Sequence, residues 1–433
     1  MIKKYDDSRE KVDRIYDVVV VGAGASGIIA AGRAAHMGAK VLLIEKMKQA
    51  GRKLSITGKG RCNITNNSPK SIHYKNIFPG GRYLKHAFHS FFVDDILNIL
   101  HSYGVETVTE RGNRVFPVSN KATDVLNALM KWMGNKNIDI LYQSTVNRLL
   151  ISEGSVTGIS VLTGKGELNV HARSVIICTG GKSYPATGST GDGYELAKQA
   201  GHSISEVRPA LAPLVTKGDI AGKLLNLSLK NVKALVWVNN KKRAEEFGEL
   251  SFTRYGLTGP IILTLSRIVL EELYRGSNVE IGIDLKPALD ENKLDARLLR
   301  DLDANGKKRI ESVFRLWLPG DIIPLFTELT GIDNNKLCHQ LNSKERRKIR
   351  LLMKDLRFTV TGHPGFKEAI ITAGGVPAGE IDSRTMESRI TGNLFFAGEV
   401  IDTDANTGGF NLQIAFSTGW LAAQECVKKI MNP

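Results

Sequence analysis

A glycine-rich turn between a buried strand and a helix constrains the fold of this chain more than any other feature. Residues 18–21 are four consecutive valines, and they run directly into Gly22, Gly24 and Gly27. In this spacing the first glycine permits a tight turn, the second lets the backbone approach a pyrophosphate, and the third lets the helix pack on the sheet. The next predicted strand ends in Glu45, which follows Gly27 by 18 positions. An acid about 20 residues onward binds an adenosine ribose in such folds, so the sequence predicts a dinucleotide-binding βαβ unit.

A second glycine-rich segment near the C-terminus predicts the other half of the same site. Residues 394–399 predict a buried strand that ends in Gly398 and Glu399, and Gly408 and Gly409 precede the last predicted helix. That helix directs its free N–H groups and positive dipole end toward whatever lies before it, and a reduced flavin carries negative charge at its pyrimidine edge. The two segments together favour FAD.

Length, apolar runs and cysteine spacing exclude several classes of protein. At 433 residues the chain exceeds what one core usually holds, so two or three domains are expected. The most apolar stretch, residues 257–270, contains Pro260 and Arg267, so no membrane span is expected. The first residues lack an apolar signal core, which predicts a cytoplasmic protein with a short solvated leader. The four cysteines never form a CxxC pair, which argues against a metal site or a dithiol flavoenzyme.

The net charge of +15 allows two interpretations. It is either a lysine-rich solvated surface or an attraction for anionic ligands such as FAD pyrophosphate, NAD(P)H or an acidic substrate. Basic residues cluster at 241–243, 307–309 and 344–348, but no aromatic residues are interleaved with them. Because a base-stacking platform needs such aromatics, the pattern does not favour nucleic acid as a partner.

Residues 51–66 predict a loop over the cofactor, because they are rich in glycine and basic residues and lack helical or strand periodicity. Arg52 or Lys53 can balance phosphate charge, and Asn63 can meet a polar flavin edge. Cys62 has Arg61 and Lys59 nearby, conditions that favour a thiolate, although packing is the simpler role.

Three stretches resemble the BaiN/YhiN family of NAD(P)/FAD-dependent oxidoreductases: residues 58–66, residues 251–260, and residues 398–399 with 407–413. The resemblance runs from about residue 16 to the C-terminus. It implies an α/β fold, in which a Rossmann-like FAD-binding domain of the two-dinucleotide-binding flavoprotein type is interrupted by an inserted domain, part β-barrel and part helical. It also implies FAD-linked redox chemistry. Related members look like reductases of 3-oxo-Δ4 steroid or bile-acid intermediates, and others look like aminoacetone oxidases.

The middle of the chain agrees with an insertion. Residues 175–181 predict a buried strand ending in a glycine turn, and short strands and then a charged helical stretch follow. The predicted organisation is a flexible leader (1–15), an FAD-binding domain (16–200 and 362–433) and an inserted cap (201–361), with its barrel at about 205–285 and 355–361 and its helical part at about 290–354. No second GxGxxG follows a buried strand, so a separate NAD(P)H domain is not expected, and if NAD(P)H is a co-substrate it should bind transiently at the flavin.

These patterns and the resemblance give a set of candidate site residues. The predicted cofactor-binding residues are Gly22, Ala23, Gly24, Ala25, Ser26, Gly27, Glu45, Lys46, Arg52, Lys53, Gly60, Arg61, Cys62, Asn63, Val146, Thr179, Gly180, Gly181, Gly398, Glu399, Gly409, Asn411 and Leu412. Reduction of an enone needs a hydride, a donor that polarises the carbonyl and a proton source. Candidate donors are Tyr255, Tyr184 and His363.

Three functions follow as hypotheses. The first is NAD(P)H-dependent reduction of a conjugated C=C bond in a small molecule, a 3-oxo-Δ4 steroid or bile-acid-like substrate. The second is oxidation of a small amine such as aminoacetone, with O2 as the electron acceptor. The third is a flavin-binding protein with a non-catalytic, interaction role.

Overall fold

The computed structural model describes residues 3–4, 15–134 and 137–432, so most of the predicted leader lies outside the described residues. The chain divides into two compact units, Met1–Pro209 with Ile370–Pro433, and Ala210–Ala369. The two boundaries between the units, after residues 209 and 369, lie later in the sequence than the predicted boundaries after residues 200 and 361. The reason is that β12 (Ser205–Ala210) and β19 (Ile371–Gly375) pair with each other beside the divisions.

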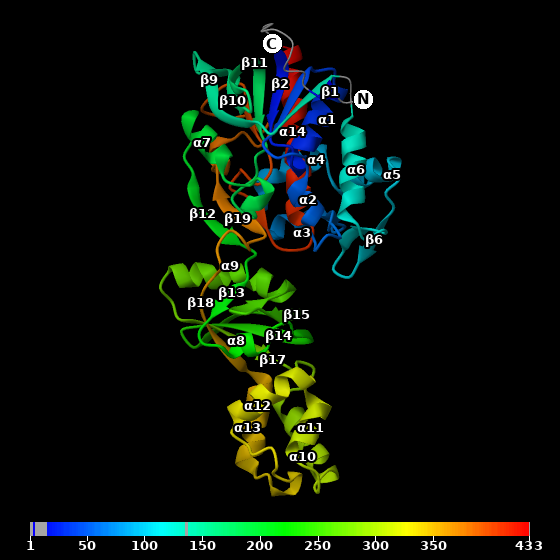
Figure 1. Ribbon diagram of the computed structural model, residues 1–433, viewed down its shortest axis with the longest axis vertical. Coiled ribbons are helices and arrows are strands. Elements are labelled where there is room, and N and C mark those ends of the chain that lie inside the picture. The colour runs from blue at the N-terminus through cyan, green and yellow to red at the C-terminus, as the bar shows by residue number, and fades with distance from the viewer. Residues whose placement is uncertain (1–2, 5–14, 135–136, 433) are drawn as a thin grey trace. The chain divides into compact units, whose positions relative to one another are not determined.

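The first unit is built on a mixed sheet whose middle is parallel (Figure 1). Its strands, in spatial order, are β1 (Lys3–Lys4), β8 (Ile138–Tyr142), β3 (Val41–Glu45), β2 (Tyr16–Val21), β11 (Gly166–Ile177), β10 (Ser155–Thr163) and β9 (Thr145–Ser152), with β20 (Leu394–Phe396) also paired to β11. The strands β1, β8, β3, β2, β11 and β20 are parallel to one another. The strands β10 and β9 are antiparallel to their neighbours, and we call them the antiparallel arm. The valines of β2 are buried, as expected of a parallel strand covered on both faces.

Two long helices from opposite ends of the chain pack together against this sheet. They are α1 (Ala25–His36) and α14 (Phe410–Met431), and Figure 1 shows them side by side. Gly419 permits the close approach, because a Cβ there would lie 2.4 Å from the backbone oxygen of Ser26. The C-terminal helix therefore completes the core that the N-terminal strand begins.

Further helices and small sheets complete the first unit. The helices are α2 (Arg52–Ile56), α3 (Lys70–Lys75), η1 (Gly81–Leu84), α4 (Lys85–Ser90), α5 (Val93–Ser102), α6 (Ala122–Met133), η2 (Pro185–Thr187), α7 (Asp192–Gln199) and η5 (Ala378–Glu380). The strands are β4 (Thr65–Asn66), β6 (Thr107–Glu110) and β7 (Arg114–Pro117) in one small sheet, and β5 (Ile77–Phe78) with β21 (Asp404–Ala405) in another.

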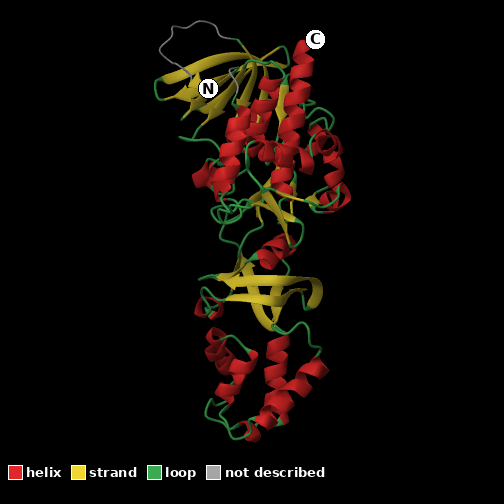
Figure 2. Ribbon diagram, turned by 90° about the vertical axis from the view of Figure 1, so that its right-hand side faces the viewer, coloured by secondary structure: helices red, strands yellow, loops and turns green. Residues whose placement is uncertain are grey.

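The second unit combines a closed antiparallel barrel with a group of helices. The barrel strands, in spatial order, are β13 (Leu214–Thr216), β16 (Gly256–Thr258), β15 (Lys241–Phe252), β14 (Ser228–Val238), β17 (Val279–Asp284) and β18 (Leu356–Gly362). The helices are α8 (Ile220–Lys223), α9 (Pro260–Tyr274), α10 (Glu291–Ala304), α11 (Ile310–Trp317), η3 (Gly320–Ile322), α12 (Ile323–Thr330), η4 (Cys338–Gln340) and α13 (Ser343–Lys354). In Figure 2 the barrel strands and the helices from α10 to α13 form separate groups.

The predicted fold class, a Rossmann-like unit with a barrel and helical insertion, is confirmed. Helix α9 was not foreseen: Pro260 suggests an interruption, but it occupies the first turn, where a proline without its N–H costs nothing. Among the described residues, no helix has both the length and the apolar character needed to cross a bilayer.

Candidate functional site

Four parallel strands of the first unit end next to one another, and each is followed by a turn or a candidate side chain. The Gly22 N–H donates to the Ile44 carbonyl at 2.8 Å, the Cys178 N–H to Val21 at 2.8 Å, and the Ala397 N–H to Ile177 at 3.0 Å. The carboxyl ends of β3, β2, β11 and β20 are therefore adjacent. In open parallel sheets this edge binds ligands.

The three glycines of the first turn have different surroundings. Gly22 has φ +99°, and a Cβ there would lie 2.7 Å from the Cys178 carbonyl oxygen. A Cβ on Gly27 would lie 1.8 Å from the oxygen of Gly22, so both positions exclude a side chain by protein packing. A Cβ on Gly24 would have no atom within 4 Å. The backbone is therefore open on the side of Gly24, which is the side that a pyrophosphate needs.

The start of α1 adds donors to this opening. Gly24 is the N-cap of α1 and provides no side-chain cap, so the first N–H groups, at Ala25 and Ser26, are left for a ligand. Helix N-termini of this kind bind phosphate through these groups and the helix dipole. The geometry fits the phosphates of a dinucleotide.

Glu45, at the end of β3, fixes the shape of the turn. One carboxylate oxygen accepts from the Ala23 N–H at 2.9 Å and the other from the Met47 N–H at 2.8 Å. Each oxygen keeps a second lone pair that a ribose hydroxyl can use. The ammonium of the next residue, Lys46, lies 2.6 Å from the Asp192 carboxylate.

A polar network joins the two halves of the site. The Glu399 carboxylate accepts from the Lys53 ammonium at 2.7 Å, from the Ser183 hydroxyl at 2.8 Å and from the Thr372 N–H at 2.8 Å. A Cβ on Gly181 would lie 2.4 Å from the Thr372 hydroxyl oxygen, so this turn requires glycine. Elements far apart in the sequence thus hold one carboxylate at the end of β20.

Ser183 and Thr372 are site residues that the sequence analysis missed. Ser183 follows the predicted turn at Gly180 and Gly181 by two residues, so a polar residue after that turn was an available signal. Thr372 comes from β19, and its position beside Glu399 depends on long-range pairing that no local pattern reveals.

Arg52 is a half-buried cation at the first position of α2, next to Lys53. Within the described part of the chain, its guanidinium forms no ion pair or side-chain hydrogen bond. The preceding residue, Gly51, donates its N–H to the Ala23 carbonyl at 2.8 Å, which places the start of α2 beside the glycine turn. Arg52 is therefore the available cation on this side of the turn.

Asn63 connects the loop after α2 to the start of α14. In the amide orientation that satisfies its neighbours, the side chain accepts from the Gly409 N–H at 3.0 Å and donates to the Thr65 carbonyl at 3.1 Å. A Cβ on Gly409, which has φ +99°, would lie 2.3 Å from that same Thr65 oxygen. The amide predicted to meet the flavin edge is thus engaged with the backbone. Asn411 also bonds locally, to the N–H and carbonyl of Ala405 at 2.9 and 2.8 Å.

Arg61 and Cys62 face the protein. The Arg61 guanidinium pairs with Glu110 and lies 4.2 Å from the ring centroid of Phe116. Cys62 is fully buried, and burial raises the pKa of its thiol to about 12. The raised pKa disfavours the thiolate, which agrees with packing as the simpler role.

The remaining predicted cofactor residues also lie in the first unit. Gly398 is held by its N–H, which donates to the Thr418 hydroxyl at 2.9 Å, and a Cβ there would lie 2.6 Å from the Ser26 hydroxyl. Val146 is buried at the start of β9. The others are Gly60, which has open space beside it, Thr179 and Gly180 after β11, and Leu412 in the first turn of α14.

The three candidate proton donors lie in both units. Tyr184 belongs to the first unit, where it is half-buried, and its backbone is left-handed at φ 53°. Tyr255 and His363 belong to the second unit. The Tyr255 hydroxyl donates to Glu368, and burial together with this carboxylate raises the pKa of Tyr255. His363 contacts the Tyr274 hydroxyl at 2.9 Å, and burial lowers the pKa of His363.

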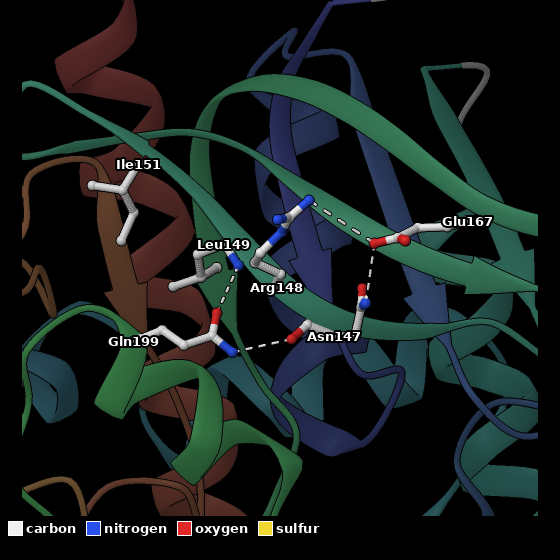
Figure 3. Close-up of a pocket in the computed structure, with 6 residues that line it drawn as sticks. All are labelled: Asn147, Arg148, Leu149, Ile151, Glu167 and Gln199. Atoms are coloured by element: carbon white, nitrogen blue, oxygen red, sulfur yellow. Dashed lines mark hydrogen bonds and ion pairs between the residues drawn. The ribbon is translucent and has the colours of Figure 1, made fainter.

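A separate depression of about 470 Å³ lies on the antiparallel arm of the first unit (Figure 3). Its polar side chains bond to one another or to the backbone: Asn147 donates to Glu167 at 3.2 Å, and Gln199 accepts from the Leu149 N–H at 3.0 Å. Neither the glycine turns nor the network of Glu399 and Lys53 lines this depression, so it is not the candidate site. In the described ranges, no group of three or more His, Cys, Asp or Glu residues is arranged to hold a metal ion.

Known proteins resemble this chain over nearly its whole length. It is 30% identical to the 3-dehydro-bile acid delta(4,6)-reductase of Clostridium scindens, covering 95% of this chain and 98% of that protein. It is 29% identical to the ribosomal RNA dihydrouridine synthase of Escherichia coli, again covering 95% of this chain and 98% of that protein. Among solved structures, a quinol–fumarate reductase superposes with a TM-score of 0.52 at 17% identity, covering 96% of this chain and 72% of that one, which shows the fold alone.

The predicted resemblance is confirmed at the level of the family and its cofactor chemistry. The protein is an FAD-dependent oxidoreductase. The family described as "HI0933-like protein Rossmann domain" matches residues 16–425, and the chain therefore belongs to this family, of the BaiN/YhiN type.

Proposed function

We propose that the protein uses NAD(P)H to saturate a C=C bond conjugated to a carbonyl, with a 3-oxo-Δ4 steroid or bile-acid-like ring as the first candidate substrate. The full-length similarity to a 3-dehydro-bile acid delta(4,6)-reductase carries this proposal. A 3-oxo group and a Δ4 double bond are conjugated, so the β-carbon is electrophilic and accepts a hydride. A proton then adds to the neighbouring carbon.

The residues of the first unit have distinct roles in this proposal. The opening at Gly24 and the start of α1 hold the pyrophosphate, Glu45 binds the adenosine ribose, and the network of Glu399 and Lys53 positions the other end of the cofactor. When bound, FAD supplies the hydride-transfer chemistry that no side chain can provide. The chain's own contribution is binding, orientation and the proton.

Tyr184 is the candidate donor that belongs to the same unit as the glycine turns. It follows Ser183, whose hydroxyl donates to Glu399. Tyr255 must exchange its bond to Glu368 before it can donate to a substrate carbonyl. We therefore propose Tyr184 as the first residue to test and Tyr255 as the second, by replacing each with phenylalanine.

Anaerobic stopped-flow with separate half-reactions tests the proposal. NADH or NADPH should bleach the bound FAD, and a 3-oxo-Δ4 bile acid should then restore its colour with formation of the saturated product. If neither pyridine nucleotide bleaches the flavin, the reductase proposal fails. Oxygen consumption with aminoacetone, in the absence of pyridine nucleotide, would instead favour the amine oxidase hypothesis.

A second candidate substrate is a uracil ring in ribosomal RNA. The net charge of +15 favours it, together with the similarity to a ribosomal RNA dihydrouridine synthase. Dihydrouridine is uridine saturated at a C=C bond conjugated to a ring carbonyl, so the chemistry is the same and only the substrate differs. The lack of aromatics among the basic clusters excludes a stacking platform, but phosphate binding requires only cations.

Nucleoside mass spectrometry tests the second candidate. Ribosomal RNA lacking the modification is incubated with the protein and NADPH, then digested and assayed for dihydrouridine. Dihydrouridine above the level without NADPH supports RNA as a substrate. If the bile acid is reduced and the RNA stays unmodified, the first candidate substrate is supported and the second is rejected.

A further inference from the structure

Exposed basic residues gather at one edge of the helical part of the second unit. The edge consists of Lys307, Lys308 and Arg309, which precede α11, with His339 in η4 and Lys344 in the first turn of α13. All five are exposed. We call this set the basic edge.

Backbone pairing brings these separate segments together. The Ile310 N–H donates to the Lys336 carbonyl at 2.9 Å, and the Cys338 N–H donates to the Lys308 carbonyl at 2.9 Å. Lys336 in turn lies 2.7 Å from Glu345, in the first turn of α13. The basic edge is therefore a fixed feature of the fold, although its side chains belong to three elements.

Two acids of the neighbouring helices are already paired with other cations. Asp295 pairs with Arg346 and Arg350 at 3.2 and 3.3 Å, and Glu345 pairs with Lys336. In the described part of the chain, the side chains of Lys307, Lys308, Arg309 and Lys344 form no ion pair. Two exposed acids, Asp303 and Glu311, flank the edge and are outnumbered by its four Lys and Arg side chains.

The basic cluster at residues 241–243 differs in its surroundings. It lies at the start of β15, and Lys242 is 2.5 Å from Glu245 in the same strand. Glu246 follows directly. This cluster has the same three charges as residues 307–309, but Lys242 is paired and two acids lie within the same strand, so it provides a control with the same charge change.

We propose that the basic edge binds the phosphate backbone of RNA. This inference rests on the second candidate function, because a base that is reduced within RNA needs the surrounding strand to be held. Flexible, unpaired cations along an edge without interleaved aromatics suit backbone phosphates, which are bound through charge and counterion release. Such contacts carry no sequence information, so the choice of base is left to the flavin site.

Fluorescence anisotropy with a labelled ribosomal RNA fragment tests the inference on the full chain with FAD bound. The variant Lys307→Glu, Lys308→Glu, Arg309→Glu should raise the Kd by at least about tenfold. Because each lost phosphate contact lowers the slope of log K against log salt by about 0.7 on a single strand, the slope should fall by about 2. The control Lys241→Glu, Lys242→Glu, Arg243→Glu carries the same charge change and should alter the Kd by less than about threefold.

Equal losses in the two variants, or unchanged binding by the basic-edge variant, overturn the inference. The inference is also overturned if the basic-edge variant loses binding to anionic phosphatidylglycerol vesicles but binds RNA like the unchanged protein. Thermal unfolding of both variants checks their folding. Should the triple variant unfold, Lys307→Ala is measured instead, and it should lower the salt slope by about 0.7.

The dihydrouridine assay separates this inference from the function on which it rests. If RNA binds through the basic edge but no dihydrouridine forms, the surface is supported and the second candidate function fails. If dihydrouridine forms and the basic-edge variant binds RNA like the unchanged protein, the function stands and the surface is wrong.

Discussion

The Lys53 ammonium lies 2.7 Å from the Glu399 carboxylate, which ties the first cofactor half-site to the last. About a quarter of each side chain is exposed, at 25% and 21%. Ser183 and Thr372 both donate to the other oxygen of this carboxylate. The pair is therefore partly desolvated and geometrically fixed, and it contrasts with the exposed ion pairs on the helices.

A double-mutant cycle on this pair should give a coupling energy of about 1 to 2 kcal/mol in the free energy of unfolding. The cycle uses Lys53→Met, Glu399→Gln and the double variant, measured by urea denaturation of the FAD-free protein. The control pair is Lys198 and Glu195, at 2.9 Å on α7 with side chains that are 54% and 69% exposed, which should give roughly 0.5 kcal/mol or less. Equal coupling in the two pairs would show that the Lys53 pair is an ordinary surface contact.

Alanine at Gly24 and at Gly27 should separate cofactor binding from folding. A methyl group on Gly24 meets open space, so Gly24→Ala should change stability by less than about 0.5 kcal/mol while FAD affinity falls steeply. A methyl group on Gly27 would lie 1.8 Å from the Gly22 oxygen, so Gly27→Ala should cost about 2 kcal/mol or more even without FAD. Chemical denaturation of the FAD-free variants and fluorescence titration with FAD measure the two effects. Loss of stability in Gly24→Ala, with FAD affinity retained, would contradict the role given to this turn.

The glycines of this turn show which part of the candidate site can be predicted from the sequence. Gly22, Gly24, Gly27 and Glu45 are close in sequence, and their spacing follows from the geometry of one βαβ unit, so their placement was predictable. The bond between Lys53 and Glu399 joins residues 346 positions apart, and only the assembled sheet brings them together. Local sequence patterns do not predict such a long-range contact.

Asn63 illustrates a different limit of prediction from sequence. Its loop was recognised as polar and close to the cofactor, but a polar side chain can bind either a ligand or the backbone. Its partners at Thr65 and Gly409 come from a strand and a helix end whose approach depends on the left-handed glycine. The identity of the loop was thus predictable, whereas the orientation of its amide was not.

The cysteines should be unreactive in the native protein. All four are unpaired and buried, and burial raises the pKa of Cys62, Cys178 and Cys426 to about 12. A thiol-reactive disulfide reagent should therefore label none of them rapidly until denaturant is added. Cys62→Ala should retain pyridine-nucleotide bleaching of the flavin. Rapid native labelling that disappears in Cys62→Ala would restore the reactive-thiolate hypothesis.

Buried His73 should make the protein less stable as the pH falls. Its ring lies 4.8 Å from Phe92 and 4.9 Å from Phe410 between centroids, and its Nδ1 is buried without a hydrogen-bond partner among the described residues. Burial lowers the pKa of His73 from its usual value, despite an opposing effect of the bond to the Asn66 carbonyl. The unfolded chain therefore binds a proton at a pH where the folded protein does not. Stability is retained above about pH 6.5 and is lost as the pH falls below it.

His73→Gln should reduce this loss, because a glutamine can donate to the Asn66 carbonyl but cannot take up a proton. The comparison is the difference in unfolding free energy between pH 7.5 and 5.5, with exposed His86→Gln as the control. Other buried groups, including His202 beside Glu380, also contribute to acid sensitivity, so the informative quantity is the change between variants. An identical pH dependence in His73→Gln and the unchanged protein would mean that the aromatic pocket admits the charged ring.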